Sequence, residues 1–67
     1  MEMGCRLKAL RKIKQTTQEQ VAKDLQISNA CYARYETNDR QPNPDMIVKL
    51  AEYFDCTTDY LLGKDRV

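Results

Sequence analysis

Apolar residues recur along the chain at helical spacing, and nowhere do they alternate with polar residues for long enough to predict a β-strand. Met3, Leu7 and Leu10 lie at positions i, i+4 and i+7, which predicts an amphipathic helix over about residues 3–14. Three further stripes continue the helical pattern: Gln18, Val21, Ala22 and Leu25, then Tyr32 and Tyr35, then Ile47, Leu50, Ala51 and Phe54. With the short fifth helix described below, the pattern predicts an all-α fold of five helices around one core.

Residues that commonly cap helices precede the second and third stripes. Thr17 begins a capping box, in which its hydroxyl accepts a hydrogen bond from the amide of Gln20 and the Gln20 side chain reaches back. Ser28 occupies the N-cap position of a third helix that extends to about Glu36. Asn38 then interrupts the pattern and is suited to a left-handed backbone conformation that ends this helix.

The last two helices also have clear start signals. Asn43 as N-cap and Pro44 at the first helical position predict the start of the fourth helix. Thr57 predicts the N-cap of a short fifth helix, in which we expect Leu61 and Leu62 to face the core.

Length and composition fit one small globular domain. The chain has 67 residues, of which 42% are apolar and 31% charged, so we expect a single domain over residues 1–67 with a core of about residues 7–63. Apolar runs never exceed four residues, which argues against a transmembrane helix and a signal peptide and makes the cytoplasm the expected compartment.

The cysteine and histidine content excludes several kinds of site. The chain has no histidine, and its three cysteines, Cys5, Cys31 and Cys56, form no CxxC pair. This content argues against a disulfide framework, a structural zinc site and a His-dependent catalytic triad. We therefore expect neither a metal nor another cofactor, and no enzymatic activity.

The charge is unevenly distributed, although the net charge is only +1. Residues 1–14 carry a net charge of +4, residues 15–40 one of −1, and residues 41–67 one of −2. A basic end of this kind is suited to face a polyanion, while a solvated amphipathic helix explains the same charges. Charge alone does not decide between these interpretations.

The second and third predicted helices are separated by only three residues, 26–28. Two helices joined so closely must cross steeply, as in a helix-turn-helix. Ala22 falls at the position where the crossing leaves room only for a small side chain. The inward positions of such a unit are all apolar here, namely Val21, Leu25, Ile27, Tyr32 and Tyr35.

The chain resembles a known family over most of its length, from about Leu7 to Gly63. The segments that carry the resemblance are Leu10-Arg11, Thr17-Gln18-Glu19-Gln20-Val21-Ala22, Ile27-Ser28, Tyr35-Glu36, Pro42, Lys49-Leu50-Ala51 and Asp59-Tyr60-Leu61-Leu62-Gly63. They resemble the phage repressor and Cro-like helix-turn-helix regulators of the Xre family. The resemblance implies a five-helix, lambda-repressor-like DNA-binding domain that acts as a homodimer on a two-fold symmetric operator. Two turn positions depart from the family's usual glycine, Gln26 and Asn38, and a left-handed Gln26 costs about 1–2 kcal/mol.

The resemblance assigns base contacts to the exposed N-terminal part of the third helix, which reads the major groove. Asn29 has the geometry to pair with adenine and Arg34 with guanine, each worth about 1–3 kcal/mol of discrimination. Ala30 and Ala33 are small enough to allow close approach and contact with a thymine methyl group. Outside the family motif, Asn29 is equally explained as a first-turn helix residue and Arg34 as a solvated charge.

A second set of residues is expected to contact DNA phosphates. Gln18 lies in the first turn of the second helix, where free amides and the helix dipole attract an anion. The remaining candidates are Thr17, Ser28, Cys31, Asn38 and Arg40, with Lys14 as a further one. Such contacts fix the register and carry no sequence information. For Thr17 and Ser28 pure capping is the alternative, and one hydroxyl is able to do both.

The resemblance also pairs Arg11 with Glu36, which would join the first helix to the end of the third. We expect this ion pair to hold the recognition helix at its docking angle. If the pair is buried, removal of Glu36 costs about 3–5 kcal/mol, because Arg11 is left without its partner. An exposed helix charge is the alternative explanation for Glu36.

Three functions compete at this point. The first is a sequence-specific transcriptional regulator, in particular a repressor, with binding that weakens steeply as salt rises. Only four residues follow the fifth predicted helix, so we expect the fourth and fifth helices to form the dimer contact. The second function is an antitoxin or other protein-binding regulator on the same fold. The near-neutral charge and the small surface available for reading bases favour it, and a neighbouring toxin-like reading frame would support it. A small enzyme lacks a nucleophile–base pair and a glycine-rich phosphate loop.

Overall fold

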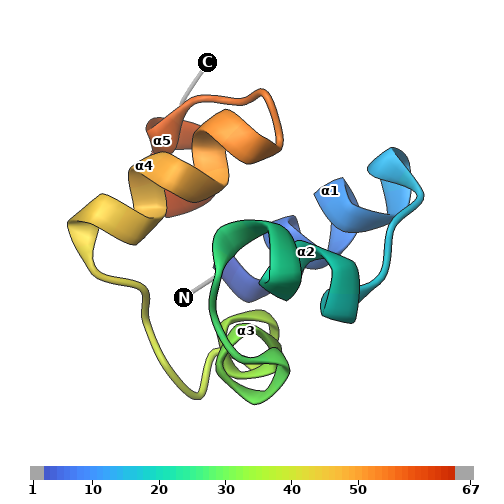
Figure 1. Ribbon diagram of the computed structural model, residues 1–67. Coiled ribbons are helices and arrows are strands. Elements are labelled where there is room, and N and C mark those ends of the chain that lie inside the picture. Colours follow the sequence, from blue (N-terminus) through green and yellow to red (C-terminus); the bar gives the residue numbers. More distant parts are fainter. Residues whose placement is uncertain (1–2, 65–67) are drawn as a thin grey trace.

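The computed structural model describes residues 3–64, which form five α-helices and, within that range, no β-strand (Figure 1). The helices are α1 (Met3–Lys14), α2 (Gln18–Leu25), α3 (Asn29–Thr37), α4 (Pro44–Tyr53) and α5 (Thr58–Leu62). The all-α, five-helix prediction is therefore confirmed.

Local signals start the helices as predicted. The hydroxyls of Thr17, Ser28 and Thr57 and the side-chain oxygen of Asn43 each accept a backbone N–H three residues further on. The capping box at Thr17 is only half formed, because Gln20 Nε2 donates instead to Asp24 Oδ1, at 2.9 Å. The expectation that Gln20 reaches back was wrong: its amide points forward to a carboxylate one turn ahead on the same helix face, and a hydrogen bond to a charged acceptor is the stronger interaction.

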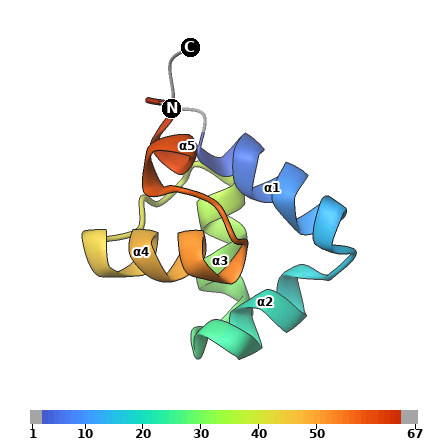
Figure 2. The same cartoon turned by 90° about the horizontal axis from the view of Figure 1, so that it is seen from above.

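The inward faces of all five helices share one core (Figure 2). Helix α3 packs against α1 and α2, while α5 packs against α1 and α4. The buried apolar residues include members of every predicted stripe: Met3, Leu7, Val21, Ala22, Tyr32, Tyr35, Ile47, Leu50, Ala51, Phe54 and Leu61. Leu10, Leu25 and Leu62 are partly buried against this core. None of the helices in residues 3–64 is both long and apolar enough to cross a membrane.

The beginning of α1 lies directly on the end of α3. Gly4 is buried, and its backbone N–H donates to Oδ1 of Asn38 at 3.0 Å. A Cβ atom on Gly4 would lie 2.8 Å from the Tyr35 carbonyl oxygen and 2.7 Å from the Glu36 carbonyl carbon, both of them backbone atoms. The two helices can approach this closely only because residue 4 has no side chain.

Candidate nucleic-acid interface

Helices α2 and α3 form the short, capped unit that the spacing predicts. Gln26 ends α2 in the left-handed conformation, with φ 61° and ψ 41°, and its N–H bonds back to the carbonyls of Ala22 and Lys23. The chain reverses within three residues, and the axes of α2 and α3 are steeply inclined to each other (Figure 2). Ala22 is 2% exposed where the helices pack, as its small side chain allows.

Helix α3 has one buried face and one exposed face. Tyr32 and Tyr35 are buried and meet edge to face, with ring centroids 6.3 Å apart. On the opposite face Ala30 and Arg34 are exposed and Ala33 is half-buried, while Asn29 is exposed in the first turn at the flank of this face. Figure 1 shows α3 end-on at one edge of the molecule, below α2. The residues expected to read bases therefore lie on an open helix face, with Ala33 the least accessible of the four.

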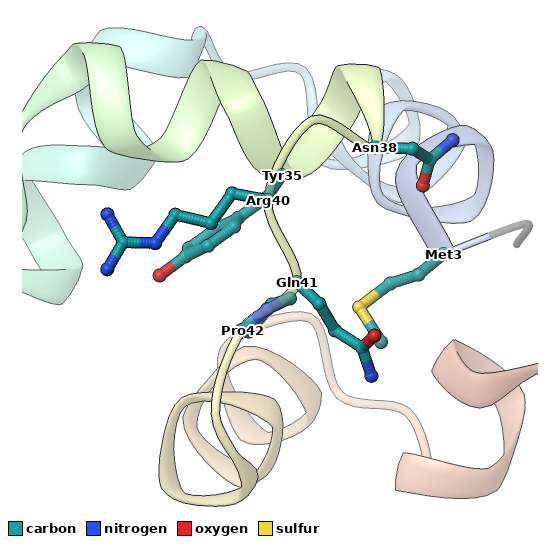
Figure 3. A pocket seen from close by; sticks show the side chains of 6 residues that line it. All are labelled: Met3, Tyr35, Asn38, Arg40, Gln41 and Pro42. Atoms are coloured by element: carbon teal, nitrogen blue, oxygen red, sulfur yellow. The ribbon is translucent and has the colours of Figure 1, made fainter.

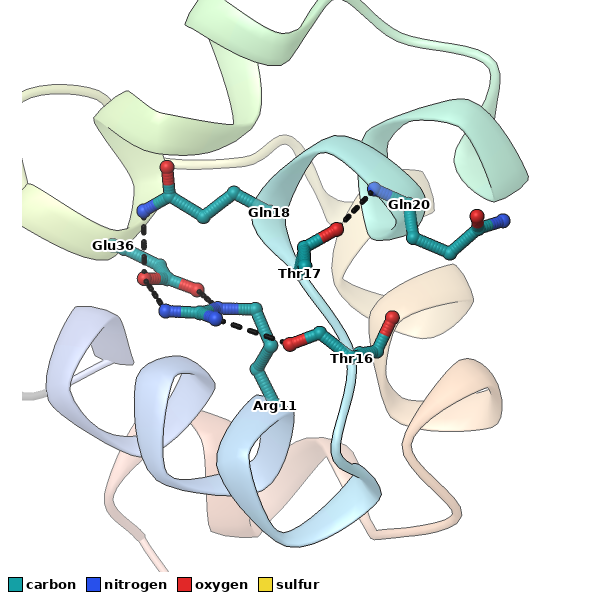
Figure 4. A network of polar contacts seen from close by, with 6 residues as sticks. All are labelled: Arg11, Thr16, Thr17, Gln18, Gln20 and Glu36. Atoms are coloured by element: carbon teal, nitrogen blue, oxygen red, sulfur yellow. Dashed lines mark hydrogen bonds and ion pairs between the residues drawn. The ribbon is translucent and has the colours of Figure 1, made fainter.

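A polar network joins the three helices around Glu36 (Figure 4). Arg11 Nε donates to Glu36 Oε2 at 2.7 Å, and a second nitrogen of the same guanidinium donates to Oε1 at 3.3 Å. Gln18 Nε2 donates to Glu36 Oε1 at 3.0 Å, and Arg11 also donates to the Thr16 carbonyl oxygen. The side chains of Arg11 and Glu36 are only 15% and 3% exposed. The predicted ion pair is thus present, bidentate and largely withdrawn from water.

The surroundings of Glu36 keep it ionised in spite of its burial. Burial raises the pKa of Glu36, but hydrogen bonds from Arg11 and Gln18 and the Arg11 charge outweigh it and lower the pKa below its ordinary value. The hydrogen bond to Glu36 correspondingly raises the pKa of Arg11. The buried Tyr32 hydroxyl, near the same carboxylate, has no hydrogen-bond partner in residues 3–64. Its burial and the Glu36 charge raise the pKa of Tyr32.

The residues expected to contact phosphates lie around α3 and the start of α2. Thr17, Ser28, Asn38 and Arg40 are exposed, while Gln18 and Cys31 are half-buried. The hydroxyls of Thr17 and Ser28 accept the capping bonds, which leaves each O–H as a donor. Asn38 has φ 65°, the left-handed conformation predicted for it, and accepts from Gly4.

The cations of the basic segment, residues 1–14, largely contact other parts of the domain and are not all available to a polyanion. Three of its five cations make contacts within the domain: Arg11 binds Glu36, Arg6 donates to the Tyr60 carbonyl oxygen and lies over the Tyr60 ring, and the Lys14 ammonium lies 5.0 Å from the centre of the Tyr53 ring. Lys14 therefore packs against α4 in this structure. Much of the apparent polyanion-binding charge holds α1 to the rest of the fold.

Some contacts of the interface have no clear signal in the sequence. The bond from Gln18 to Glu36 joins residues 18 positions apart, and the Tyr53 hydroxyl donates to Asp24 at 2.7 Å across 29 positions. The contact at Gly4 could have been suspected, because an isolated glycine within a helical pattern often marks close packing. The other two depend on tertiary placement alone.

Comparison with known proteins supports the resemblance seen in the sequence. A helix-turn-helix family model matches residues 7–61. Over 67 residues the chain is 42% identical to the HTH-type transcriptional regulator ImmR of Bacillus subtilis (strain 168) and 31% identical to the HTH-type transcriptional activator BcrR of Enterococcus faecalis. Over 63 residues it is 32% identical to Repressor protein C2 of Salmonella phage P22.

These alignments cover nearly all of this chain and only part of each relative. The 67-residue matches use 100% of the chain and the phage match 94%, while they cover 53% of ImmR, 33% of BcrR and 29% of the phage repressor. The chain thus spans about half the length of ImmR and less of the other two. Because the family match extends from α1 into α5, the chain belongs to the helix-turn-helix family of phage-repressor-like (Xre) transcriptional regulators.

Proposed function

We propose that this chain binds double-stranded DNA sequence-specifically as the DNA-binding domain of a transcriptional regulator, with α3 in the major groove. The observation that carries the proposal is the two-sided character of α3, which is anchored by Tyr32, Tyr35 and Glu36 on one side and exposed at Ala30 and Arg34 on the other, with Asn29 exposed in its first turn. A protruding helix with small residues next to an amide and a guanidinium is suited to enter a groove about 12 Å wide. We propose that it acts in this way in the cytoplasm and without catalysis.

The exposed face supplies the chemistry of base recognition. Asn29, in the first turn, would pair with the N6 and N7 atoms of adenine, and Arg34 with the O6 and N7 atoms of guanine. Ala30 and Ala33 would allow close approach, with their methyl groups facing thymine. Because Ala33 is half-buried, its contribution is smaller than that of Ala30.

Phosphate contacts would hold the recognition helix in register. Gln18 has two amide N–H groups and uses one of them on Glu36, so the other would donate to a phosphate oxygen near the start of α2. Thr17, Ser28 and Asn38 would contribute neutral donors, and Arg40 a positive charge. Through the bond to Gln18 and the pair with Arg11, Glu36 would position both α2 and α3 on the DNA.

We further propose a homodimer on a two-fold symmetric operator. Successive major-groove half-sites on one face of DNA lie about 34 Å apart, and a domain with a single recognition helix reads only one of them. Val48 on α4 is 46% exposed, and an exposed apolar residue there supports a contact formed by α4 and α5. Sedimentation of the protein alone and on operator DNA tests this; a monomer in both states would refute the dimer.

We propose that binding represses transcription, because repression requires only that this domain occupy the operator. A promoter–reporter pair with and without the operator tests the direction of regulation. Increased expression on binding would instead identify an activator.

Selection of bound fragments from random duplex DNA tests the central proposal. We expect an enriched motif with two related half-sites, and an affinity that falls as salt rises. Arg34→Ala should relax the preference at one position of each half-site, whereas the exposed cation Lys12 on α1 serves as the matched control, and Lys12→Ala should leave the motif unchanged. Absence of any enriched motif would refute sequence-specific binding and favour a protein partner as the main ligand.

A further inference from the structure

The two edges that border the exposed face of α3 carry different polar groups. On one edge Glu36 binds Gln18, at the start of α2. On the other edge the Cys31 thiol donates to the Tyr35 hydroxyl oxygen, with the two heavy atoms 3.4 Å apart. At 100° per residue Cys31 lies about 60° around the helix from Arg34, and Tyr35 about 40° further. The Cys31–Tyr35 edge is therefore next to the face expected to read bases.

Arg40 reaches the same edge from the connection between α3 and α4. A hollow of about 180 Å³ lies there, lined by Met3, Tyr35, Asn38, Arg40, Gln41 and Pro42. Figure 3 shows the Tyr35 hydroxyl and the Arg40 guanidinium side by side at one end of this hollow. A neutral hydroxyl and a permanent positive charge, 5 positions apart in sequence, thus point the same way.

The Tyr35 hydroxyl is set up as a hydrogen-bond donor. Its oxygen accepts from Cys31, so its own hydrogen is directed elsewhere. Burial raises the pKa of Tyr35 above its ordinary value, and the hydroxyl is therefore protonated at neutral pH. A phenol O–H beside a guanidinium offers several donors to one group that carries several anionic oxygens.

We propose that Tyr35 and Arg40 together bind a backbone phosphate of the DNA strand that runs along this edge of α3. A helix in the major groove has one sugar–phosphate backbone on each side, and the edge at Gln18 serves only one of them. Tyr35 is then both a core residue, through its ring, and a DNA contact, through its hydroxyl. This inference rests on the proposed function, since it assumes that α3 lies in the groove.

The test compares three variants on the duplex enriched in the selection experiment. Tyr35→Phe keeps the ring and should weaken binding about tenfold, the loss expected for one hydrogen bond to a charged group, without changing the salt dependence. Arg40→Gln should also weaken binding. It should make the plot of log affinity against log salt less steep by about 0.9, the value expected when one phosphate is no longer neutralised. Tyr60→Phe, which removes a hydroxyl from α5, is the matched control and should bind as the unmodified chain does.

Ethylation interference separates a direct contact from an indirect structural effect. We expect that ethylation of one particular phosphate in each half-site weakens binding of the unmodified chain. Ethylation of that same phosphate should not weaken binding of Tyr35→Phe or Arg40→Gln any further, because these variants have already lost the contact. Thermal unfolding of each variant confirms that it is folded. Unchanged affinity and an unchanged interference pattern for Tyr35→Phe would overturn the inference while leaving the proposed function intact. Failure of the unmodified chain to bind any duplex would instead refute the proposed function itself.

Discussion

The interaction between Glu36 and Arg11 makes a quantitative prediction about stability. Glu36→Ala removes the acceptor of two Arg11 hydrogen bonds and one Gln18 hydrogen bond and leaves the guanidinium, 15% exposed, without its carboxylate partner. Removing one partner of a buried pair costs about 3–5 kcal/mol. We expect about 3 kcal/mol, because Arg11 keeps its bond to the Thr16 carbonyl and is partly open to water.

That loss is large for a chain of this size. At about 0.05–0.15 kcal/mol per residue, the whole domain is stable by about 3–10 kcal/mol. Urea unfolding followed by circular dichroism gives the free energy of unfolding for each variant. Glu19→Ala, which removes an exposed carboxylate from α2, is the matched control and should change it by less than about 0.5 kcal/mol. A loss below about 1 kcal/mol for Glu36→Ala would show that the pair acts as an ordinary surface ion pair, and would refute the reasoning.

The same pair determines the acid sensitivity of the fold. The folded-state pKa of Glu36 is lowered, so its contribution is fully present above the unfolded-state pKa of about 4.3 and is lost as the pH falls through the folded-state pKa. Glu36→Gln has no such proton to take up. The free energy of unfolding of this variant should therefore fall less steeply below about pH 4 than that of the unmodified chain. If the two free energies fall in parallel with pH, the lowered pKa of Glu36 is not the cause of the acid sensitivity.

Three further substitutions test other parts of the structure by the same unfolding measurement. Gly4→Ala should destabilise by about 1–3 kcal/mol through overpacking against the backbone of α3, although alanine is the better helix former by about 1 kcal/mol; a stabilised variant would show that α1 can shift. Gln26→Gly should stabilise by about 0.5–1 kcal/mol, since relief of the left-handed strain exceeds the added chain entropy and the Gln26 side chain is exposed. Tyr32→Phe should be neutral or stabilising by up to about 1 kcal/mol, because it removes a buried hydroxyl that has no partner in residues 3–64; a loss above about 1 kcal/mol would indicate a bond to Glu36.

The local features of the fold were predictable because each depends on a few neighbouring residues. A hydroxyl or amide at Thr17, Ser28 or Asn43 satisfies amides that a helix start leaves open, whatever lies elsewhere in the chain. Asn38 likewise ends α3 through its own tolerance of positive φ. Competition within the same turn explains the one local error, in which Gln20 bonds forward to Asp24.

The tertiary part of the site was predictable only where the family pattern supplied it. The resemblance paired Arg11 with Glu36, and the structure forms that pair. No periodicity indicated that Gln18 would share the same carboxylate, or that the exposed Lys14 ammonium would lie over the Tyr53 ring. These contacts depend on the angles between helices, which the core packing determines and a one-dimensional pattern does not contain.

The division of α3 into separate sides has a consequence for how specificity can change. Tyr32 and Glu36 are committed to the fold, and Tyr35 joins the core through its ring. Ala30 and Arg34 are exposed and make no side-chain contact of comparable weight with the rest of residues 3–64. Substitutions at these two positions should therefore alter the preferred DNA sequence while changing the free energy of unfolding by less than about 0.5 kcal/mol. Ala30→Gln together with Arg34→Gln tests this directly: a variant that loses stability instead of changing its motif would show that the reading face is also part of the scaffold.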